Sequence, residues 1–287
     1  MRFAFIEEKK ASYPISMMCR VFEVSRQGFY QWRNRPLSSR VRQNVEDAQR
    51  VREAYERGRR YGGYRTVYRQ LQKDGHPVGK HRTARLLRQQ GLFGRPRKRY
   101  RTTTNSNHDR GYAPNLLNRG FQVSTPDTVW LADITYVRTK DGWLYLAAIL
   151  DLSLRKIVGW AVRDHMHAEL ATTALQMAID QRRPPPGLVH HSDRGVQYAS
   201  DEYRAKLEQA GMVQSMSRKA NCWDNAPMES FFGTLKRELI DGYVFTNKDE
   251  AVTALFEYIE VFYNRTRLHS AIGYMPPAEY ERRLKAA

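Results

Sequence analysis

Residues 128–164, TVWLADITYVRTKDGWLYLAAILDLSLRKIVGWAVRD, give the strongest indication of the fold. Its first part, 128–139, is rich in β-branched and aromatic residues, as strands are. Residues 142–154 form an almost continuously apolar run, which is typical of a central strand covered on both faces. Residues 156–164 supply a third strand, and the short connections favour antiparallel hairpins. One carboxylate, Asp133, lies within the first of these strands.

Helices and strands alternate after the third strand. Residues 167–183 have apolar residues at helical spacing and end before three prolines, which cannot continue a helix. A short strand ends near Asp193, a helix follows over 201–210, and residues 211–217 form a fifth strand before the helix that contains Glu229. The order βββαβαβα is that of the ribonuclease H-like fold. We therefore expect an α/β domain with a five-stranded mixed sheet flanked by helices.

This order brings three carboxylates together. In such a sheet the first and fourth strands are neighbours and the helix after the fifth packs across them, so Asp133, Asp193 and Glu229 converge at one edge. Taken alone, Asp193 would equally suit a turn and Glu229 a helix start. Clustered carboxylates repel one another unless cations lie between them, and Mg²⁺ prefers hard oxygen ligands. The three carboxylates together predict an active site that binds two divalent cations. The expected ion is Mg²⁺, and Mn²⁺ is a possible substitute.

The charge of the chain is unevenly distributed. The first 120 residues contain 28 Lys and Arg against 9 Asp and Glu, a net charge of +19, whereas the remainder contains 20 against 21, a net charge of −1. A basic excess confined to one segment is typical of a module that binds a polyanion. A basic surface that aids solubility is the alternative. Membrane-surface binding is less favoured, because the basic helices also carry the apolar residues of compact domains.

Two helical modules are predicted within the basic segment. Residues 12–33 have the layout of a helix-turn-helix, with Ser25 as N-cap of a second helix that buries Phe29 and Trp32. Residues 61–91 repeat this plan more clearly. Packing alone, or a solvated arginine face, is the alternative to DNA contact in these modules. The exposed side chains that we expect to contact DNA are Arg26, Gln27, Tyr30, Arg33, Arg82, Arg85 and Gln89.

The domain boundaries follow from these patterns. We expect a helix-turn-helix module over residues 1–58, a second such module over 59–93, a basic linker over 94–120 and a catalytic core with a C-terminal helical extension over 121–287. Two cysteines are too few for a disulfide framework, and no apolar run is long enough to span a membrane, so a cytoplasmic protein is expected. The linker side chains expected to follow a DNA backbone are Arg95, Arg97, Lys98 and Arg99.

Three motifs resemble the signature blocks of the DDE transposases related to retroviral integrases. Thirty-five residues separate Asp193 from Glu229, and Lys236 follows Glu229 by seven positions, both of which match that superfamily. The amino-acid sequence most closely resembles the OrfB transposases of the third bacterial insertion-sequence family, and this resemblance extends over nearly the whole chain. The motifs are LADITYV at 131–137, HHSDRGVQY at 190–198 and WDNAPMESFFGTLKRE at 223–238.

The resemblance implies a DNA transposase with Asp133, Asp193 and Glu229 as catalytic metal ligands. Such an enzyme uses Mg²⁺ to cleave DNA at the ends of an insertion sequence and joins the freed 3′-hydroxyl to another phosphodiester. Two alternatives remain: a DNA-binding regulator with a vestigial catalytic domain, and a ribonuclease H-like nuclease without joining activity. Intact carboxylates at full spacing argue against the regulator.

Residues around these motifs have expected roles. Lys236 lies two helical turns beyond the glutamate, where it would contact a DNA phosphate, with a solvated lysine as the alternative. Asn225 is expected to touch DNA or, like Asp224, to cap the helix. His190 and His191 are expected to pack and form hydrogen bonds at the strand end rather than to bind metal.

The expected partners follow from the same resemblance. The chain would bind double-stranded DNA, both the terminal inverted repeats and the target, in the bacterial nucleoid. It would act as a homo-oligomer of at least two copies, because an element has two ends to bring together. The longest transposase in this family is often a fusion with an upstream helix-turn-helix, so a fused or bound upstream-frame product is a further expected partner.

Overall fold

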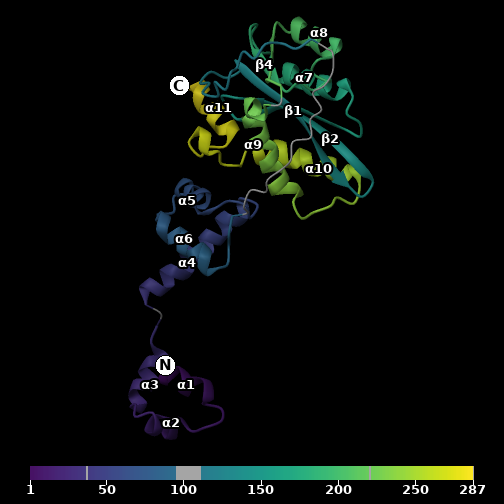
Figure 1. Cartoon of the computed structure of the whole chain (residues 1–287). Coiled ribbons are helices and arrows are strands. Elements are labelled where there is room, and N and C mark those ends of the chain that lie inside the picture. Colours follow the sequence, from purple (N-terminus) through teal and green to yellow (C-terminus); the bar gives the residue numbers. More distant parts are fainter. Residues whose placement is uncertain (37, 95–110, 220, 287) are drawn as a thin grey trace.

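A computed structural model describes residues 1–36, 38–94, 111–219 and 221–286. The described chain forms two helical modules and an α/β domain (Figure 1). The four basic side chains predicted to follow DNA from the linker lie outside the described residues, and their DNA contacts stay a prediction. These side chains are Arg95, Arg97, Lys98 and Arg99.

The first module consists of three short helices. Phe29 is fully buried among them, and the Ser25 hydroxyl accepts a hydrogen bond from the Gly28 amide at 2.9 Å, which confirms the predicted N-cap. The predicted burial of Trp32 is wrong. Its side chain is 41% exposed, because it stacks at the edge of the module, 5.8 Å from the ring of Phe3. The helices are α1 (Arg2–Lys9), α2 (Ile15–Val21) and α3 (Arg26–Asn34).

The second module contains one helix more than the sequence indicates. Val51 and Ala54 of α4 share a buried cluster with Leu71 of α5 and with Leu86 and Leu87 of α6. The expected boundary at residue 58 would separate α4 from this cluster. The structure groups α4 with the second module instead, because α5 and α6 bury its apolar residues. The helices are α4 (Ser39–Arg57), α5 (Tyr64–Lys73) and α6 (Lys80–Gln89).

The α/β domain is built on a five-stranded mixed sheet with the strand order β3-β2-β1-β4-β5. The first three strands form antiparallel hairpins, and β4 runs parallel to both β1 and β5. All five predicted strands, the hairpins and the β1–β4 pairing are confirmed, and the domain has the ribonuclease H-like fold. The strands are β1 (Val129–Thr139), β2 (Gly142–Asp151), β3 (Lys156–Arg163), β4 (Val189–Ser192) and β5 (Val213–Met216).

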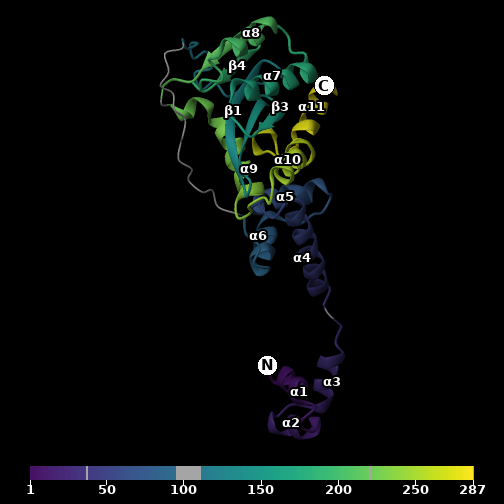
Figure 2. The ribbon, with the colours of Figure 1, turned by 90° about the vertical axis from the view of Figure 1, so that its right-hand side faces the viewer.

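Helices cover both faces of the sheet (Figures 1 and 2). Trp130 packs with α7 and α8 in one cluster, whereas its neighbour Leu131 packs in the other with α9, α10 and the π-helical turn after α10. The stripe Ala251, Leu255, Tyr258, Ile259 and Phe262 lies in that second cluster, so the C-terminal extension completes the core. These elements are α7 (Ala168–Arg182), α8 (Asp201–Gln209), α9 (Ala226–Leu235), α10 (Lys248–Phe256), the turn Glu257–Tyr263 and α11 (Pro277–Ala286).

Gly159 of β3 allows α7 to lie close against the sheet. A Cβ at this position would come within 2.3 Å of the carbonyl oxygen of Ala174 and 2.7 Å of the Cβ of Ala178. Gly159→Ala is therefore expected to lower the free energy of unfolding by about 2 kcal/mol in a urea titration. Gly233→Ala is the control, because nothing lies within 4 Å of its Cβ position in α9. A loss no larger than the control's would contradict the close packing.

Candidate active site

The pairing of β1 with β4 brings the two aspartates together. Leu131 of β1 lies opposite His191 of β4 in a parallel register. Asp133 and Asp193 each follow these partners by two positions, Asp133 within β1 and Asp193 directly after the end of β4. They therefore lie side by side at the same level of the sheet. Glu229 lies in the first turn of α9, where it is exposed.

Asn225 holds the beginning of α9 against β1. Its side-chain amide donates to the carbonyl oxygen of Ala132 at 3.1 Å, directly beside Asp133. The sequence predicts a DNA contact or a cap for Asn225. Its side chain is 4% exposed and makes no cap hydrogen bond to α9, so the expected cap is not observed, and its contact with DNA stays a prediction. Its contact with β1 sets where Glu229 lies relative to the aspartates.

The three carboxylates interact electrostatically. Burial raises the pKa of Asp133 well above its usual value, and the charges of Asp193 and Glu229 raise it further. The amide of Ile134, which donates to Asp133 Oδ1 at 2.8 Å, and the charge of Lys236 lower this pKa only in part. Repulsion of this kind is relieved when a cation binds among the carboxylates.

The donor set suits a hard divalent cation, because carboxylate oxygens are the ligands that Mg²⁺ prefers. In the parts of the chain that the structure describes, no three Asp, Glu, His or Cys side chains are arranged to hold an ion as they stand. Binding of an ion would therefore require Asp133, Asp193 and Glu229 to approach one another.

Lys236 directly follows the end of α9, seven positions beyond Glu229, and begins the π-helical turn Lys236–Ile240. Its ammonium lies over the ring of Tyr136, 4.5 Å from the centroid. Burial lowers the pKa of Lys236, and the charge of Asp133 raises it. Its position near Asp133 agrees with the spacing in the sequence, and its contact with a DNA phosphate stays a prediction.

The two histidines before Asp193 are structural. His190 Nε2 is hydrogen-bonded to the Tyr203 hydroxyl at 3.0 Å, and the ring nitrogens of His191 lie 2.8 and 3.2 Å from the hydroxyls of Ser215 and Ser217. Burial lowers the pKa of His190 to about 3 and that of His191 to about 4, so both rings are neutral at pH 7. The predicted packing and hydrogen-bonding role is confirmed.

Asp224 has a role that the sequence did not indicate. Its fully buried carboxylate accepts hydrogen bonds from Arg218 at 2.8 and 2.9 Å, from Arg119 at 3.0 Å and from the Asn115 amide at 2.9 Å. The Arg218 guanidinium in particular holds its pKa well below the usual value. Asp224 thus connects the segment before β1, the loop after β5 and the turn that leads to Glu229. It does not cap α9 as expected.

Most of the α3 side chains that we predict to contact DNA are exposed to solvent. Arg26, Gln27 and Arg33 are exposed. Tyr30 is half-buried, because its ring packs 5.4 Å from that of Phe29 and lies beneath the Arg33 guanidinium at 4.9 Å. The module therefore presents a polar helix face, and its DNA contacts stay a prediction.

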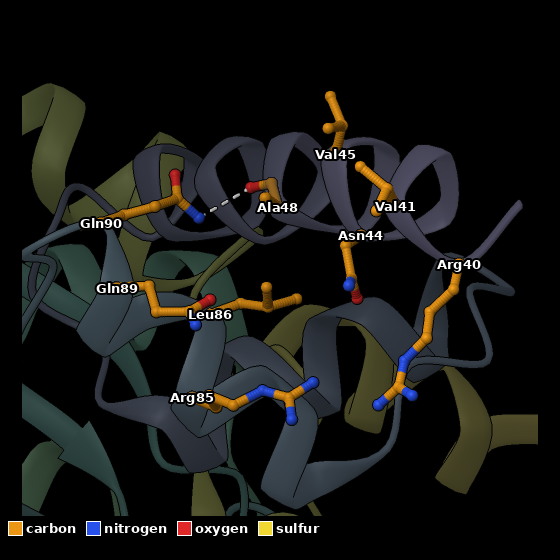
Figure 3. A pocket seen from close by; sticks show the side chains of 9 residues that line it. All are labelled: Arg40, Val41, Asn44, Val45, Ala48, Arg85, Leu86, Gln89 and Gln90. Carbon is orange, nitrogen blue, oxygen red and sulfur yellow. Dashed lines mark hydrogen bonds between the residues drawn. The ribbon is translucent and has the colours of Figure 1, made fainter. Parts of the chain in front are cut away.

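On α6 the predicted residues divide into two groups. Arg85 and Gln89 are exposed and line, together with Arg40, a surface pocket of about 400 Å³ between α4 and α6 (Figure 3). Arg82 instead pairs with the buried Asp47 at 2.7 Å. Arg82 therefore holds α6 against α4, while the DNA contacts of the three residues stay a prediction.

No helix in the described parts of the chain is both long enough and apolar enough to cross a membrane. The sequence matches the integrase core domain family at residues 123–222 and again at 229–284. It also matches the HTH-like domain family at residues 42–100. This last match begins within α4 and extends through α5 and α6, in agreement with the grouping of these three helices.

Two curated relatives match nearly the full chain. Transposase InsF for insertion sequence IS3A of Escherichia coli (strain K12) is 39% identical over 285 residues, which cover 98% of each chain. The insertion element IS600 uncharacterized 31 kDa protein of Shigella sonnei is 48% identical over 263 residues, 92% of this chain and 97% of the relative.

Solved integrase structures are also similar to this chain. The simian T-cell lymphotropic virus intasome in complex with PP2A regulatory subunit B56 gamma matches with a TM-score of 0.46 and 16% identity, over 76% of this chain and 70% of the other. The HTLV-2 integrase catalytic core domain in complex with magnesium matches with a TM-score of 0.42 and 16% identity, over 54% of this chain and 96% of the other.

The family matches and the ribonuclease H-like domain with helical modules before it define the class of protein. It is a DNA transposase with an integrase-type catalytic core, an enzyme of the DDE class. A regulator with a vestigial core is not favoured. The identity to InsF, which extends over almost every residue of both chains, narrows the assignment. The chain belongs to the family of the InsF transposases of insertion sequence IS3.

Proposed function

We propose that this transposase cleaves DNA at the ends of its insertion sequence and joins the freed ends to target DNA, with Asp133, Asp193 and Glu229 as ligands of two Mg²⁺ ions. The observation that supports the proposal is the β1–β4 register, in which Asp133 and Asp193 each follow the Leu131–His191 pair by two positions. When bound, such ions activate an attacking oxygen and stabilise the leaving oxygen of a phosphodiester, and Mn²⁺ is the expected substitute.

The side chains around the carboxylates have separate tasks in this proposal. Asp133 is fixed within β1, and Asp193 Oδ1 accepts a hydrogen bond from the Gly195 amide at 2.9 Å, so both are held by backbone. Lys236 neutralises a phosphate of the strand at the active site. The exposed residues of α3 and α6 bind the flanking duplex: Arg26, Gln27, Arg33, Arg85 and Gln89.

The assembly is part of the same proposal. Two ends must be held together for joining, so the active form is a homo-oligomer of at least two copies on DNA. A product of an upstream reading frame, fused or bound, adds further contacts to the terminal repeats. Sequence-independent phosphate contacts of the basic modules place the protein on the nucleoid.

A strand-cleavage assay with the full chain tests the function. The substrate is a labelled duplex that carries an end of the element, incubated with Mg²⁺, with Mn²⁺ or with EDTA. We expect nicked and branched products with either metal and none in EDTA, while a gel-shift shows that DNA stays bound in all three. Binding without any product would support a regulator, and nicked products without branched ones would support a nuclease.

A further inference from the structure

A pocket of about 580 Å³ lies where the second module meets the catalytic core. Figure 2 shows α5 directly beside the core at this junction. The start of α5, at Gly63–Thr66, forms one wall, α9 forms a second, and residues 267–271 form a third. The pocket is therefore complete only while the module rests on the core.

The lining of the pocket is strongly basic. Arg65, Arg155, Arg237 and Arg267 come from four different segments, and none of the described lining residues is acidic. Glu238 is a buried carboxylate close to the pocket. It accepts hydrogen bonds from the Arg267 guanidinium at 2.8 and 2.9 Å and from the Tyr258 hydroxyl at 2.9 Å. Glu238 is thus shared by Arg267 and, at 3.6 Å, by Arg237, and no acidic residue of the described chain lines the pocket beside Arg65 and Arg155.

One of these guanidinium groups is incompletely satisfied, and another has a single long hydrogen bond. Arg237 is 14% exposed and lies 3.6 Å from a Glu238 carboxylate oxygen, but its Nε is buried without a hydrogen-bond partner in the described part of the chain. Arg155 donates to the Phe121 carbonyl at a long 3.5 Å. Burial lowers the pKa of Arg155, and the nearby Tyr263 raises it in part. Buried cations of this kind need an anion or further acceptors.

The start of α5 adds to the positive potential. Gly63 is the N-cap of this helix and provides no side-chain hydrogen bond to the first turn. Amide groups at a helix N-terminus favour anions, which the arginines around the pocket would attract independently. Ser230, Thr234 and Ser270 contribute hydroxyl groups to the same lining. The chemistry suits a phosphate group, whose oxygens accept from guanidinium, amide and hydroxyl donors.

The pocket lies next to the active site on the same helix. Its α9 lining residues recur at helical spacing and form one stripe: Pro227, Ser230, Phe231 and Thr234. Glu229 and Lys236 belong to the adjacent stripe, about 100° around the helix axis. A DNA strand that lies along Glu229 and Lys236 therefore passes beside the mouth of the pocket.

We propose that this pocket holds one backbone phosphate of the DNA bound at the neighbouring active site, with Arg65 and Arg155 as its principal ligands. The proposal rests on the proposed function, which places DNA along α9. The phosphate then joins the module to the core, where Lys73 already pairs with Glu279 and the Arg59 guanidinium lies 4.8 Å from the Phe262 ring. DNA binding and module docking thus support each other.

Salt-dependent DNA binding by the full chain tests this site. Binding to a fluorescein-labelled duplex is measured in EDTA over a series of salt concentrations. Arg65→Gln and Arg155→Gln are each expected to weaken binding roughly tenfold and to reduce the slope of log K against log salt by about one. The double variant should lose no more than about one in slope, because both side chains hold the same phosphate.

The control is Arg282→Gln, which removes the same charge from an exposed position on α11 and should leave the slope unchanged. Thermal melting confirms that each variant is folded. Wild-type slopes in both pocket variants would overturn the proposal, and so would a double variant whose slope falls by about two, which indicates separate phosphates.

A second arm separates DNA from a free anion. If inorganic phosphate raises the melting temperature of the wild type but not of Arg65→Gln, while the DNA slopes stay equal, the pocket takes a small anion and the proposal fails. The binding assay contains no metal. If the full chain does not cleave DNA but the pocket variants have reduced salt slopes, only the catalytic proposal is contradicted. If the full chain cleaves DNA normally and the salt slopes of the pocket variants are unchanged, only the pocket proposal is contradicted.

Discussion

Asp193→Asn is expected to abolish strand cleavage and joining, with a fall in rate of about 10³-fold or more, while DNA binding is retained. Asp193 Oδ1 accepts from the Gly195 amide at 2.9 Å, and an asparagine oxygen preserves this hydrogen bond. The substitution therefore removes the negative charge beside Asp133 and leaves the local backbone unchanged. A carboxamide lacks the charge needed to hold a divalent cation there.

The products are separated on a denaturing gel from a labelled duplex that carries the element end, and binding is followed by gel-shift. Asp201→Asn is the matched control, since Asp201 is an exposed acidic residue in the first turn of α8. It should leave both cleavage and binding unchanged. Strand transfer retained by Asp193→Asn would remove this carboxylate from the catalytic centre.

Much of the catalytic domain could be predicted because its signals are local. The apolar run of β2 and the short turns on either side are sufficient to indicate two hairpins, and each carboxylate lies beside an element that its own neighbours define. The β1–β4 pairing follows from the order of elements alone, so the adjacency of Asp133 and Asp193 could be expected. The distance between these aspartate side chains and the Glu229 carboxylate could not be predicted, because it depends on side-chain rotation.

The contacts that escaped prediction join distant segments. The apolar face of α4 gives no sign of whether α3 or α5 and α6 will bury it, so the module boundary was misplaced. Asparagine is a residue type that often caps helices. The Asn225 amide instead donates a hydrogen bond to a β1 carbonyl that is 93 residues away in the sequence. Trp32 is apolar enough for a core, but its module is too small to enclose it.

Asp224→Asn is expected to lower the free energy of unfolding by about 3 kcal/mol at pH 7, because it breaks a buried ion pair. This is the low end for such pairs, since Arg119 and Arg218 are each 47% exposed and partly rehydrate. Cleavage should fall as well, because the turn before Glu229 loses its anchor.

The pH dependence identifies the charge as the cause. Arg218 lowers the pKa of Asp224 in the folded protein, so its contribution to stability is present above the unfolded pKa of about 4 and is lost as the pH falls toward the folded pKa. In urea titrations, the difference between wild type and Asp224→Asn should therefore be full at pH 7 and smaller at pH 3. Asp180→Asn, which changes an exposed carboxylate on α7, is the control and should show little difference at either pH. A difference for Asp224→Asn that stays constant across this range would assign the loss to packing rather than to the ion pair, and the anchoring of the turn before Glu229 would then not be electrostatic.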